Sequence, residues 1–499
     1  MTEQSPALTG RARWIALVVL CVGMLMIILD QTIVNVALPS IQRDLKFSPS
    51  SLAWVVNAYL IAFGGLLMLA GRLGDLIGRK RMFLAGLAIF TAASALCGLA
   101  NSQGLLVGAR FVQGVGGAMT SSVILGVIVT MFPEPREQAK AIGVFSFVAS
   151  AGASIGLLAG GILTQALDWH WIFFVNLPIG VVTALLAIRL VASDIGIGLR
   201  KGADIPGAVL VTGTLMLAVY TIVKTSDYGW GSAHTLLFGA VAVALLLGFL
   251  VRESRARTPL IPLRIFRSRN VSGANLVQML MVAGLFGMFF LGAVYLQRGL
   301  GYDPLEVGLA FLPVALGIGV LSLSVAPRLN MRIGPRATLL PGLVLMVAGL
   351  LLFAAAPVHA DYVRNLLPVM LLIGVGAGLS FPSLTTIAMS GATPSDSGLA
   401  SGLVNTSLQV GGALGLAVLA TLSSSRANDL HAAGSSPTAA LAGGLHLALA
   451  IGAGLVVAAV ITAATVLRPA RAMGEVASET AAEPESDYTE DPAALPEAA

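Results

Sequence analysis

Two charged residues, Asp30 and Arg110, lie within long apolar stretches of the sequence. Asp30 interrupts the stretch WIALVVLCVGMLMIILDQTIVNVALPSI, from Trp14 to Ile41, and Arg110 interrupts the stretch 104–131. A charge inside a membrane-spanning helix is energetically costly, and such residues mark proton relays, substrate pathways or ion pairs. A carboxyl group whose surroundings change between wet and dry can bind and release a proton. The two residues therefore predict a proton-coupling site, and a permanent structural ion pair is the alternative.

The depth of each polar group along its helix predicts which of them meet. At about 1.5 Å of rise per residue, Asp30 and Arg110 both lie roughly ten Å inside the outer ends of their helices. Asn57, in the stretch 52–71, falls at a similar depth, and Gln113 lies about one turn deeper than Arg110. We therefore expect a polar layer of Asp30, Asn57 and Arg110, with Gln113 below it.

The composition of the whole chain assigns these stretches to a membrane. Of 499 residues, 57% are hydrophobic and 11% are charged, and the mean hydropathy is +0.90. An α-helix needs about 20 apolar residues to cross a bilayer, so we predict an all-α polytopic membrane protein with fourteen transmembrane helices. These helices are expected near 14–37, 52–71, 82–100, 104–131, 141–165, 171–190, 206–224, 235–251, 271–297, 307–327, 337–357, 365–390, 398–423 and 443–467.

Positive charge is distributed unevenly among the predicted loops. The net charge is +5, and most Lys and Arg residues fall in every second loop, which places both termini in the cytoplasm and explains the basic charge without a nucleic-acid partner. Residues Arg72 and Gly78 recur as Arg328 and Gly334, which indicates a duplicated six-helix unit. The predicted organisation is a cytoplasmic N-terminus 1–13, a six-helix bundle 14–191, two additional helices 206–251, a basic cytoplasmic connector 252–270, a second six-helix bundle 271–467 and a disordered acidic cytoplasmic tail 472–499.

The loop GRLGDLIGRKR, between the second and third predicted spans, combines glycines, which allow a tight turn, with a basic cluster and one acid. On physical grounds alone it is a turn anchored at the anionic inner surface of the membrane. It closely resembles the signature loop of the major facilitator superfamily. The resemblance implies a latch that holds the cytoplasmic helix ends together in one conformational state, formed by Gly71, Arg72, Asp75, Gly78, Arg79 and Arg81.

Further stretches resemble the fourteen-helix drug:proton antiporter family of that superfamily. LDQTIVNVALPSI (29–41) resembles its first-helix motif, ARFVQGVGGA (109–118) its Arg-Gln-Gly motif, and GASIGLLAGGIL (152–163) its antiporter motif. DWHWIFFVNLPIG (168–180) and YLQRGLGYDPLEVGLAFLP (295–313) are also similar to segments of this family. Together these stretches extend the resemblance over most of the chain.

The antiporter motif places glycines at i, i+4 and i+8 on one helix face, where they permit close packing between membrane helices. Simple packing is an alternative to a direct role in antiport. The family usually has proline where this chain has Leu157, so no role for a proline kink is expected there. The residues assigned to this motif are Gly152, Gly156, Gly160 and Gly161.

The second half of the chain offers neutral polar side chains inside its predicted spans. A binding pocket near the midplane between the two halves is expected for a transporter built from repeats, and Met, Phe and amide side chains would suit bulky amphiphilic molecules. Hydrogen bonds between helices are the alternative role for each amide. The substrate-pathway candidates are Asn57, Gln113, Asn275, Gln278, Asn405 and Gln409.

The sequence shows neither histidines at metal-ligand spacing nor a phosphate-binding loop ending in Gly-Lys-Ser/Thr. We therefore expect no metal, no cofactor and no enzymatic activity, with the proton gradient as the source of energy. The resemblance implies a monomeric antibiotic or multidrug antiporter of the bacterial cytoplasmic membrane, which exchanges protons for lipophilic small molecules by alternating access. An exporter of an endogenous metabolite, siderophore or lipid is the alternative, and a transporter-like sensor or assembly factor without flux is a third possibility.

Overall fold

The computed structural model describes residues 10–48, 50–192, 194, 196, 198, 204–256, 259–261, 263–390 and 397–468. Regular structure within these ranges is entirely helical, which confirms the predicted all-α fold. The tail expected over 472–499 lies outside the described residues, as does most of the N-terminus expected over 1–13.

The first half of the chain runs from α1 to α7. A short 3₁₀ turn, Ser51–Ala53, leads into α2, and α6 and α7 together form one membrane-spanning length, Trp171–Leu190. The helices are α1 (Gly10–Leu45), α2 (Trp54–Ile77), α3 (Arg79–Gly98), α4 (Gln103–Met131), α5 (Pro135–Ala166), α6 (Trp171–Phe174) and α7 (Asn176–Leu190).

A hairpin of two helices, α8 (Ile205–Tyr228) and α9 (Ala233–Arg255), separates the first half from the second. The second half begins with a 3₁₀ turn, Leu263–Arg267, and π-helical turns at Leu321–Val325 and Tyr362–Leu366 precede α12 and α14. Its helices are α10 (Arg269–Arg298), α11 (Pro304–Val320), α12 (Ala326–Ile333), α13 (Pro335–Ala354), α14 (Leu367–Ser390), α15 (Ser397–Ala432) and α16 (Pro437–Thr465).

Among the described residues, thirteen helical spans have the length and hydropathy needed to cross a membrane. Helix α5, with 32 residues, is the fourteenth long helix, and its described apolar part is Ile155–Ala166. The helix content therefore agrees with the predicted polytopic membrane protein.

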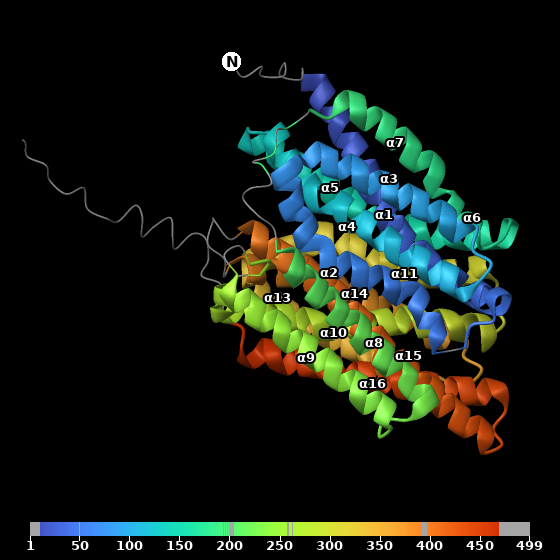
Figure 1. Cartoon of the computed structure of the whole chain (residues 1–499). Helices are drawn as coiled ribbons and strands as arrows, with labels where there is room; N and C mark the ends of the chain where they lie inside the picture. Colours follow the sequence, from blue (N-terminus) through green and yellow to red (C-terminus); the bar gives the residue numbers. More distant parts are fainter. Residues whose placement is uncertain are drawn as a thin grey trace, which may run out of the picture.

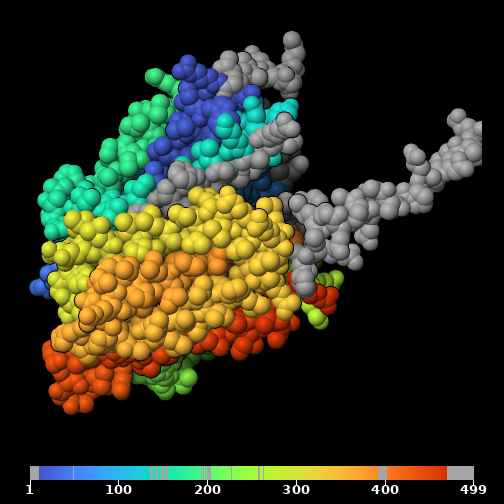
Figure 2. Space-filling view, turned by 180° about the vertical axis from the view of Figure 1, so that it is seen from behind, coloured from blue at the N-terminus to red at the C-terminus, as the bar shows by residue number. Residues whose placement is uncertain are grey.

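Among the described residues, the two halves are separate bundles that meet mainly through three pairs of helices, with a smaller contact between α1 and α11. In the first half, α1 packs against α5 and α7, and α4 packs against α2 and α3; in the second, α10 packs against α15 and α16. The halves meet where α5 contacts α11, α2 contacts α15 and α1 contacts α10, and the α8–α9 hairpin packs on α2 and α15 through α8 (Figure 1). Figure 2 shows the reverse side, with the blue-to-green first half above the yellow-to-red second half.

Helix α4 lies close to both α2 and α3 because glycines face its two neighbours. A Cβ atom at Gly114 would lie 2.4 Å from the carbonyl oxygen of Tyr59 on α2. A Cβ atom at Gly116 would lie 2.5 Å from the backbone nitrogen of Phe90 on α3. Small residues of this kind allow membrane helices to pack at short distance. Arg110, one turn before Gly114, is consequently buried inside the first half, with 1% of its surface exposed.

Candidate functional site

Asp30, on α1, is fully buried and has hydrogen bonds to side chains from two other helices. Its Oδ2 atom accepts from Arg110 Nη1 of α4 at 2.5 Å, and its Oδ1 atom accepts from Gln113 Nε2 of the same helix at 2.8 Å. Asn176 Nδ2, at the start of α7, donates to Oδ1 at 3.1 Å. Both carboxylate oxygens therefore have partners although no part of the side chain is exposed.

Arg110 is held by more than its ion pair. Its Nε atom donates to the carbonyl oxygen of Val55 on α2 at 2.9 Å, and its Nη1 atom also donates to Gln113 Oε1 at 2.7 Å. The guanidinium lies over the Tyr59 ring, 4.5 Å from the centroid, in the arrangement of a cation–π contact. A planar guanidinium with several donors can satisfy these partners at once, as a lysine ammonium could not.

Helix α3 adds small polar groups beneath the carboxylate. Ser94 Oγ accepts from Gln113 Nε2 at 2.6 Å and from Asn176 Nδ2 at 3.1 Å. The Cys97 thiol donates to Gln113 Oε1 at 3.6 Å. Four helices thus contribute side chains to one buried network, which we call the Asp30 cluster: Asp30, Ser94, Arg110, Gln113 and Asn176.

The structure brings three of the four predicted layer residues together and places the fourth elsewhere. Asp30, Arg110 and Gln113 are directly hydrogen-bonded. Asn57 is also fully buried, but neither of its amide atoms has a hydrogen-bond partner among the described residues. It lies seven positions before Gly64, hence on the same face of α2, and Gly64 contacts α15.

Asn176 and Ser94 belong to the cluster although neither is among the site residues predicted from the sequence. Asn176 falls in the stretch 168–180, which resembles a segment of the antiporter family. The available signal was a single amide in an otherwise apolar run, directly after the short helix α6. Ser94 gave no comparable signal, because serines are common at packed positions of membrane helices.

Two predicted substrate-pathway amides, Asn275 and Gln278, connect α10 to α15. Asn275 Oδ1 accepts from Ser407 Oγ at 2.8 Å, and Gln278 Nε2 donates to the Val404 carbonyl oxygen at 3.3 Å. Both side chains are buried. These contacts are hydrogen bonds between helices, the alternative role considered for such amides.

The other two candidates, Asn405 and Gln409, lie one turn apart on α15. Gln409 is 4% exposed, and its Oε1 atom has no hydrogen-bond partner in the described part of the chain. A Cβ atom at Gly64 would lie 2.8 Å from the Gln409 Cβ atom, so Gln409 packs directly on α2. Asn405 is exposed. The facing sides of α2 and α15 therefore carry two buried amides, Asn57 and Gln409, with unpaired atoms.

The glycines of the antiporter motif form the contact between α5 and α1. A Cβ atom at Gly156 would lie 1.9 Å from Thr32 Oγ1, and one at Gly160 would lie 2.7 Å from the Ile33 carbonyl oxygen. Gly152 also faces α1. Only glycine fits at this distance, so the motif allows α5 to pack next to the helix that carries the buried acid.

The adjacent face of α5 contacts the second half through the same kind of packing. A Cβ atom at Gly161 would lie 2.7 Å from Leu305 Cα of α11. A Cβ atom at Gly308 of α11 would lie 2.6 Å from the Leu157 carbonyl oxygen. Helix α5 therefore links α1 directly to the other half of the molecule.

The predicted latch lies at the turn between α2 and α3, where Gly78 has a φ of 105° that favours glycine. Asp75 Oδ1 accepts from Arg79 Nε at 3.1 Å and Nη2 at 3.0 Å, and Arg79 Nη1 donates to the Gly126 carbonyl oxygen of α4 at 3.0 Å. Asp194, after α7, accepts from the Arg79 backbone nitrogen at 2.7 Å. The remaining predicted latch residues lie on the flanking helices: Gly71 and Arg72 on α2, and Arg81 on α3.

In the described part of the chain, two bundles of long helices joined by the α8–α9 hairpin enclose a buried ion pair held by amides, which is the architecture of a polytopic membrane transporter. Residues 20–416 match the Major Facilitator Superfamily, and the chain belongs to this family. Its likeness to a bacterial homologue of the human lysosomal transporter Spinster, with a TM-score of 0.66 and 16% identity over 92% of this chain and 98% of that one, shows the same fold.

The chain is also similar to export and resistance proteins of actinobacteria. It is 40% identical over 438 residues to the puromycin resistance protein pur8 of Streptomyces alboniger, covering 87% of this chain and 86% of that one. It is 37% identical over 417 residues to the cephamycin export protein CmcT of Amycolatopsis lactamdurans, covering 82% and 85%. The predicted family is confirmed, and the protein is a membrane-embedded transporter of small molecules rather than an enzyme.

Proposed function

We propose that this protein is a proton-coupled exporter of amphiphilic drugs or antibiotics that works by alternating access. The relatives named for antibiotic resistance and export support the direction of transport and the class of substrate. We place it as a monomer in a bacterial cytoplasmic membrane, with both termini in the cytoplasm, and take the proton gradient as its energy source. The observation that carries this proposal is the hydrogen-bonding of the Asp30 cluster.

Arg110 has hydrogen-bond partners other than Asp30, so protonation of Asp30 does not remove all of its contacts. Removing one partner of a buried ion pair is costly when the other charge is left uncompensated. Here Arg110 also donates to the carbonyl oxygen of Val55 and to Gln113, and lies over the Tyr59 ring. These contacts do not depend on the charge of Asp30, so part of the guanidinium stays hydrogen-bonded in both protonation states of the carboxyl group.

Protonation of Asp30 would change how tightly α1 is held to its neighbours. The ionised carboxylate accepts hydrogen bonds from α4 and α7, and bonds of this charged kind are stronger than neutral ones. We propose that loss of the charge loosens α1, which transmits the change to α5 through the seam at Gly156 and Gly160. Since α5 packs on α11 of the second half, proton binding would then favour one arrangement of the halves over the other.

We propose that substrate is recognised between α2 and α15, where Asn57 and Gln409 face one another's helices. A buried polar atom without a partner costs about 1–3 kcal/mol, and a substrate group that pairs with it would recover that free energy. A bulky amphiphile with one or two polar groups would satisfy these atoms among apolar neighbours. The remaining pathway candidates are Asn275, Gln278 and Asn405. To bind substrate, these side chains would have to give up their present contacts or change position during the transport cycle.

The Asp75–Arg79 pair is our proposed latch at the cytoplasmic end of the first half. The side chains of Arg79 and Asp75 are 31% and 43% exposed, so the pair can separate with little free-energy cost. A contact of this strength suits an element that must form and break in every cycle.

Expression in a pump-deficient bacterial host tests the function. We expect this protein to raise resistance to members of a panel of lipophilic antibiotics that includes puromycin, and we expect an uncoupler to abolish the effect. Asp30→Asn should abolish it as well, whereas Asp429→Asn, at an exposed position of α15, should retain it. Resistance that persists with the uncoupler, in cells that have lost their proton gradient, would contradict proton coupling.

A further inference from the structure

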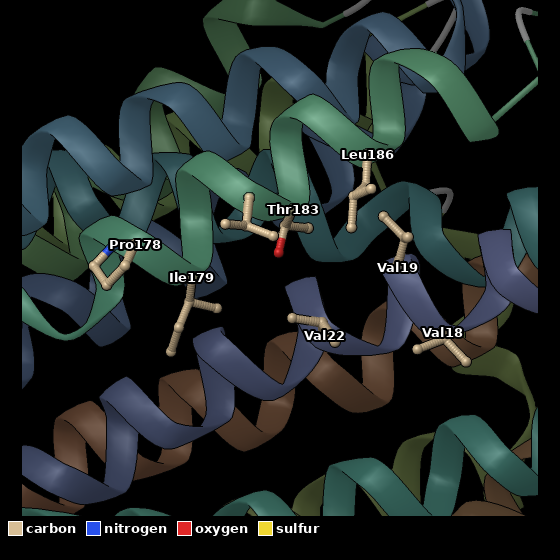
Figure 3. Close-up of a pocket in the computed structure, with 8 residues that line it drawn as sticks. Val18, Val19, Val22, Pro178, Ile179, Thr183 and Leu186 are labelled. Atoms are coloured by element: carbon tan, nitrogen blue, oxygen red, sulfur yellow. The ribbon is translucent and has the colours of Figure 1, made fainter.

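A groove of about 360 Å³ runs between α1 and α7 on the outside of the first half (Figure 3). Its walls are the side chains of Val18 and Val22 on one helix and Ile179, Val182 and Leu186 on the other. Val18 and Val182 are 56% and 55% exposed, so the groove opens away from the bundle. Both helices belong to the first half, and the groove is therefore separate from the seams where the halves meet.

Arginines lie at the end of the groove where α1 begins and α7 ends. Arg11 is seven positions before Val18, and Arg189 is seven positions after Val182, so each lies on the same helix face as the groove residue. Both arginines are exposed. Within the described part of the chain, neither forms an ion pair.

Two of the described acidic groups near this end of the groove, Glu137 and Asp194, are already engaged. Glu137 pairs with Arg13 at 3.6 Å, and Asp194 accepts hydrogen bonds from the backbone nitrogens of Arg79 and Lys80. Lys80 Nζ donates to the Ile188 carbonyl oxygen at 2.8 Å, which adds a further cation beside the end of α7. The mouth of the groove therefore presents positive charge with an apolar channel beneath it.

We infer that this groove binds one anionic phospholipid, with an acyl chain between α1 and α7 and the phosphate beside Arg11 and Arg189. Basic groups at a membrane surface attract anionic lipid headgroups, and an apolar groove below them fits the attached chain. Charge complementarity favours this occupant over an uncharged lipid or a second protein copy. The inference stands independently of proton coupling.

The site would affect the Asp30 cluster through helix spacing. Thr183, at the floor of the groove, points between the two helices in Figure 3, and its methyl carbon lies near Gly23 of α1. Further along the same two helices, Asn176 of α7 donates to Asp30 of α1. A chain that fills the groove supports the separation of α1 and α7 on which this hydrogen bond depends.

Binding can be measured on the purified full-length protein by titration with phosphatidylglycerol or with phosphatidylcholine of the same acyl chains, followed by native mass spectrometry. We expect phosphatidylglycerol to bind more tightly. The double variant Arg11→Gln/Arg189→Gln should lose that preference, by about fivefold for each arginine. Arg332→Gln, at an exposed arginine of α12, is the matched control and should keep it.

A second variant tests the groove without changing charge. Val182→Trp places a large side chain at an exposed position and should remove one bound lipid of either headgroup, while Val344→Trp, at a 53% exposed position of α13, should not. Equal affinity for the two lipids in the unaltered protein, or an unchanged lipid count in folded Val182→Trp, would overturn the inference. So would a dimeric particle that Val182→Trp converts to a monomer, because the groove would then be a subunit interface.

Discussion

Asn176 Nδ2 lies 3.1 Å from Asp30 Oδ1, which joins the start of α7 to the middle of α1 across 146 positions of sequence. The same nitrogen lies 3.1 Å from Ser94 Oγ on α3. Because Asp30 is fully buried, hydrogen bonds from protein donors stabilise its charge in place of bulk solvent. The amide of Asn176 therefore donates a hydrogen bond that stabilises the buried carboxylate.

Removing that amide should weaken both the fold and transport. Asn176→Ala leaves Asp30 Oδ1 with one donor fewer, and the loss of a hydrogen bond to a buried charged group costs about 1–3 kcal/mol. We expect a lower unfolding temperature in detergent and slower uncoupler-sensitive efflux. Asn428→Ala, at an exposed asparagine of α15, should change neither; equal stability of the two variants would contradict a supporting role for Asn176.

Arg110→Lys tests whether geometry matters beyond charge. Lysine keeps the positive charge but cannot reach Asp30, Gln113 and the Val55 carbonyl oxygen together, as the guanidinium does. We expect folded protein with strongly reduced initial rates of efflux, whereas Arg332→Lys on α12 should transport normally. Full activity of Arg110→Lys would mean that the cluster needs only a cation.

The α1–α5 seam should not tolerate a methyl group. In Gly156→Ala the new Cβ atom would meet Thr32 Oγ1 at 1.9 Å and the Leu29 carbonyl oxygen at 2.9 Å, and overpacking of this kind costs about 1–3 kcal/mol. Thr32→Ala should restore part of the lost thermal stability, because it removes the nearer of the two contacts. Gly108→Ala, where the structure leaves open space, is the control and should be neutral or stabilising.

We expect Asp194 to contribute mainly to stability and Asp75 mainly to transport. Asp194 caps the start of α3 through backbone nitrogens at 2.7 and 3.1 Å, and loss of such a cap costs about 0.5–2 kcal/mol. The partly exposed Asp75–Arg79 pair contributes about 0–1 kcal/mol. We expect Asp194→Ala to lower the unfolding temperature more than Asp75→Asn, and Asp75→Asn to reduce efflux more than its stability loss explains. The reverse order of unfolding temperatures would show that the latch is chiefly structural.

The membrane class and the pairing of Asp30 with Arg110 could be predicted from the sequence because a charge in an apolar run is a strong signal. The ends of the helices were harder to predict from the sequence. Helix α15 was expected over 398–423 but continues to Ala432, because a helix can extend beyond an apolar run through polar residues such as those after Thr421.

The position of Asn57 shows that depth along a helix does not predict the direction in which a side chain points. Depth along a helix follows from its rise per residue, but the direction of a side chain depends on how the helix is rotated in the bundle. The Tyr59 ring faces α4, where it lies against the Arg110 guanidinium, while Asn57 shares the face of Gly64 toward α15. A rotation of this kind is decided by the packing of glycines against neighbouring backbones, which a single sequence does not reveal.

The most direct test of proton coupling is substrate-driven proton movement in proteoliposomes that contain a pH-sensitive dye, using an antibiotic identified by the resistance panel. We predict that a substrate gradient drives protons in the opposite direction in the unaltered protein and in Asp429→Asn. Asp30→Asn, reconstituted to the same level, should bind the antibiotic but move no protons. Undiminished proton movement in Asp30→Asn would contradict the assignment of Asp30 as the coupling residue.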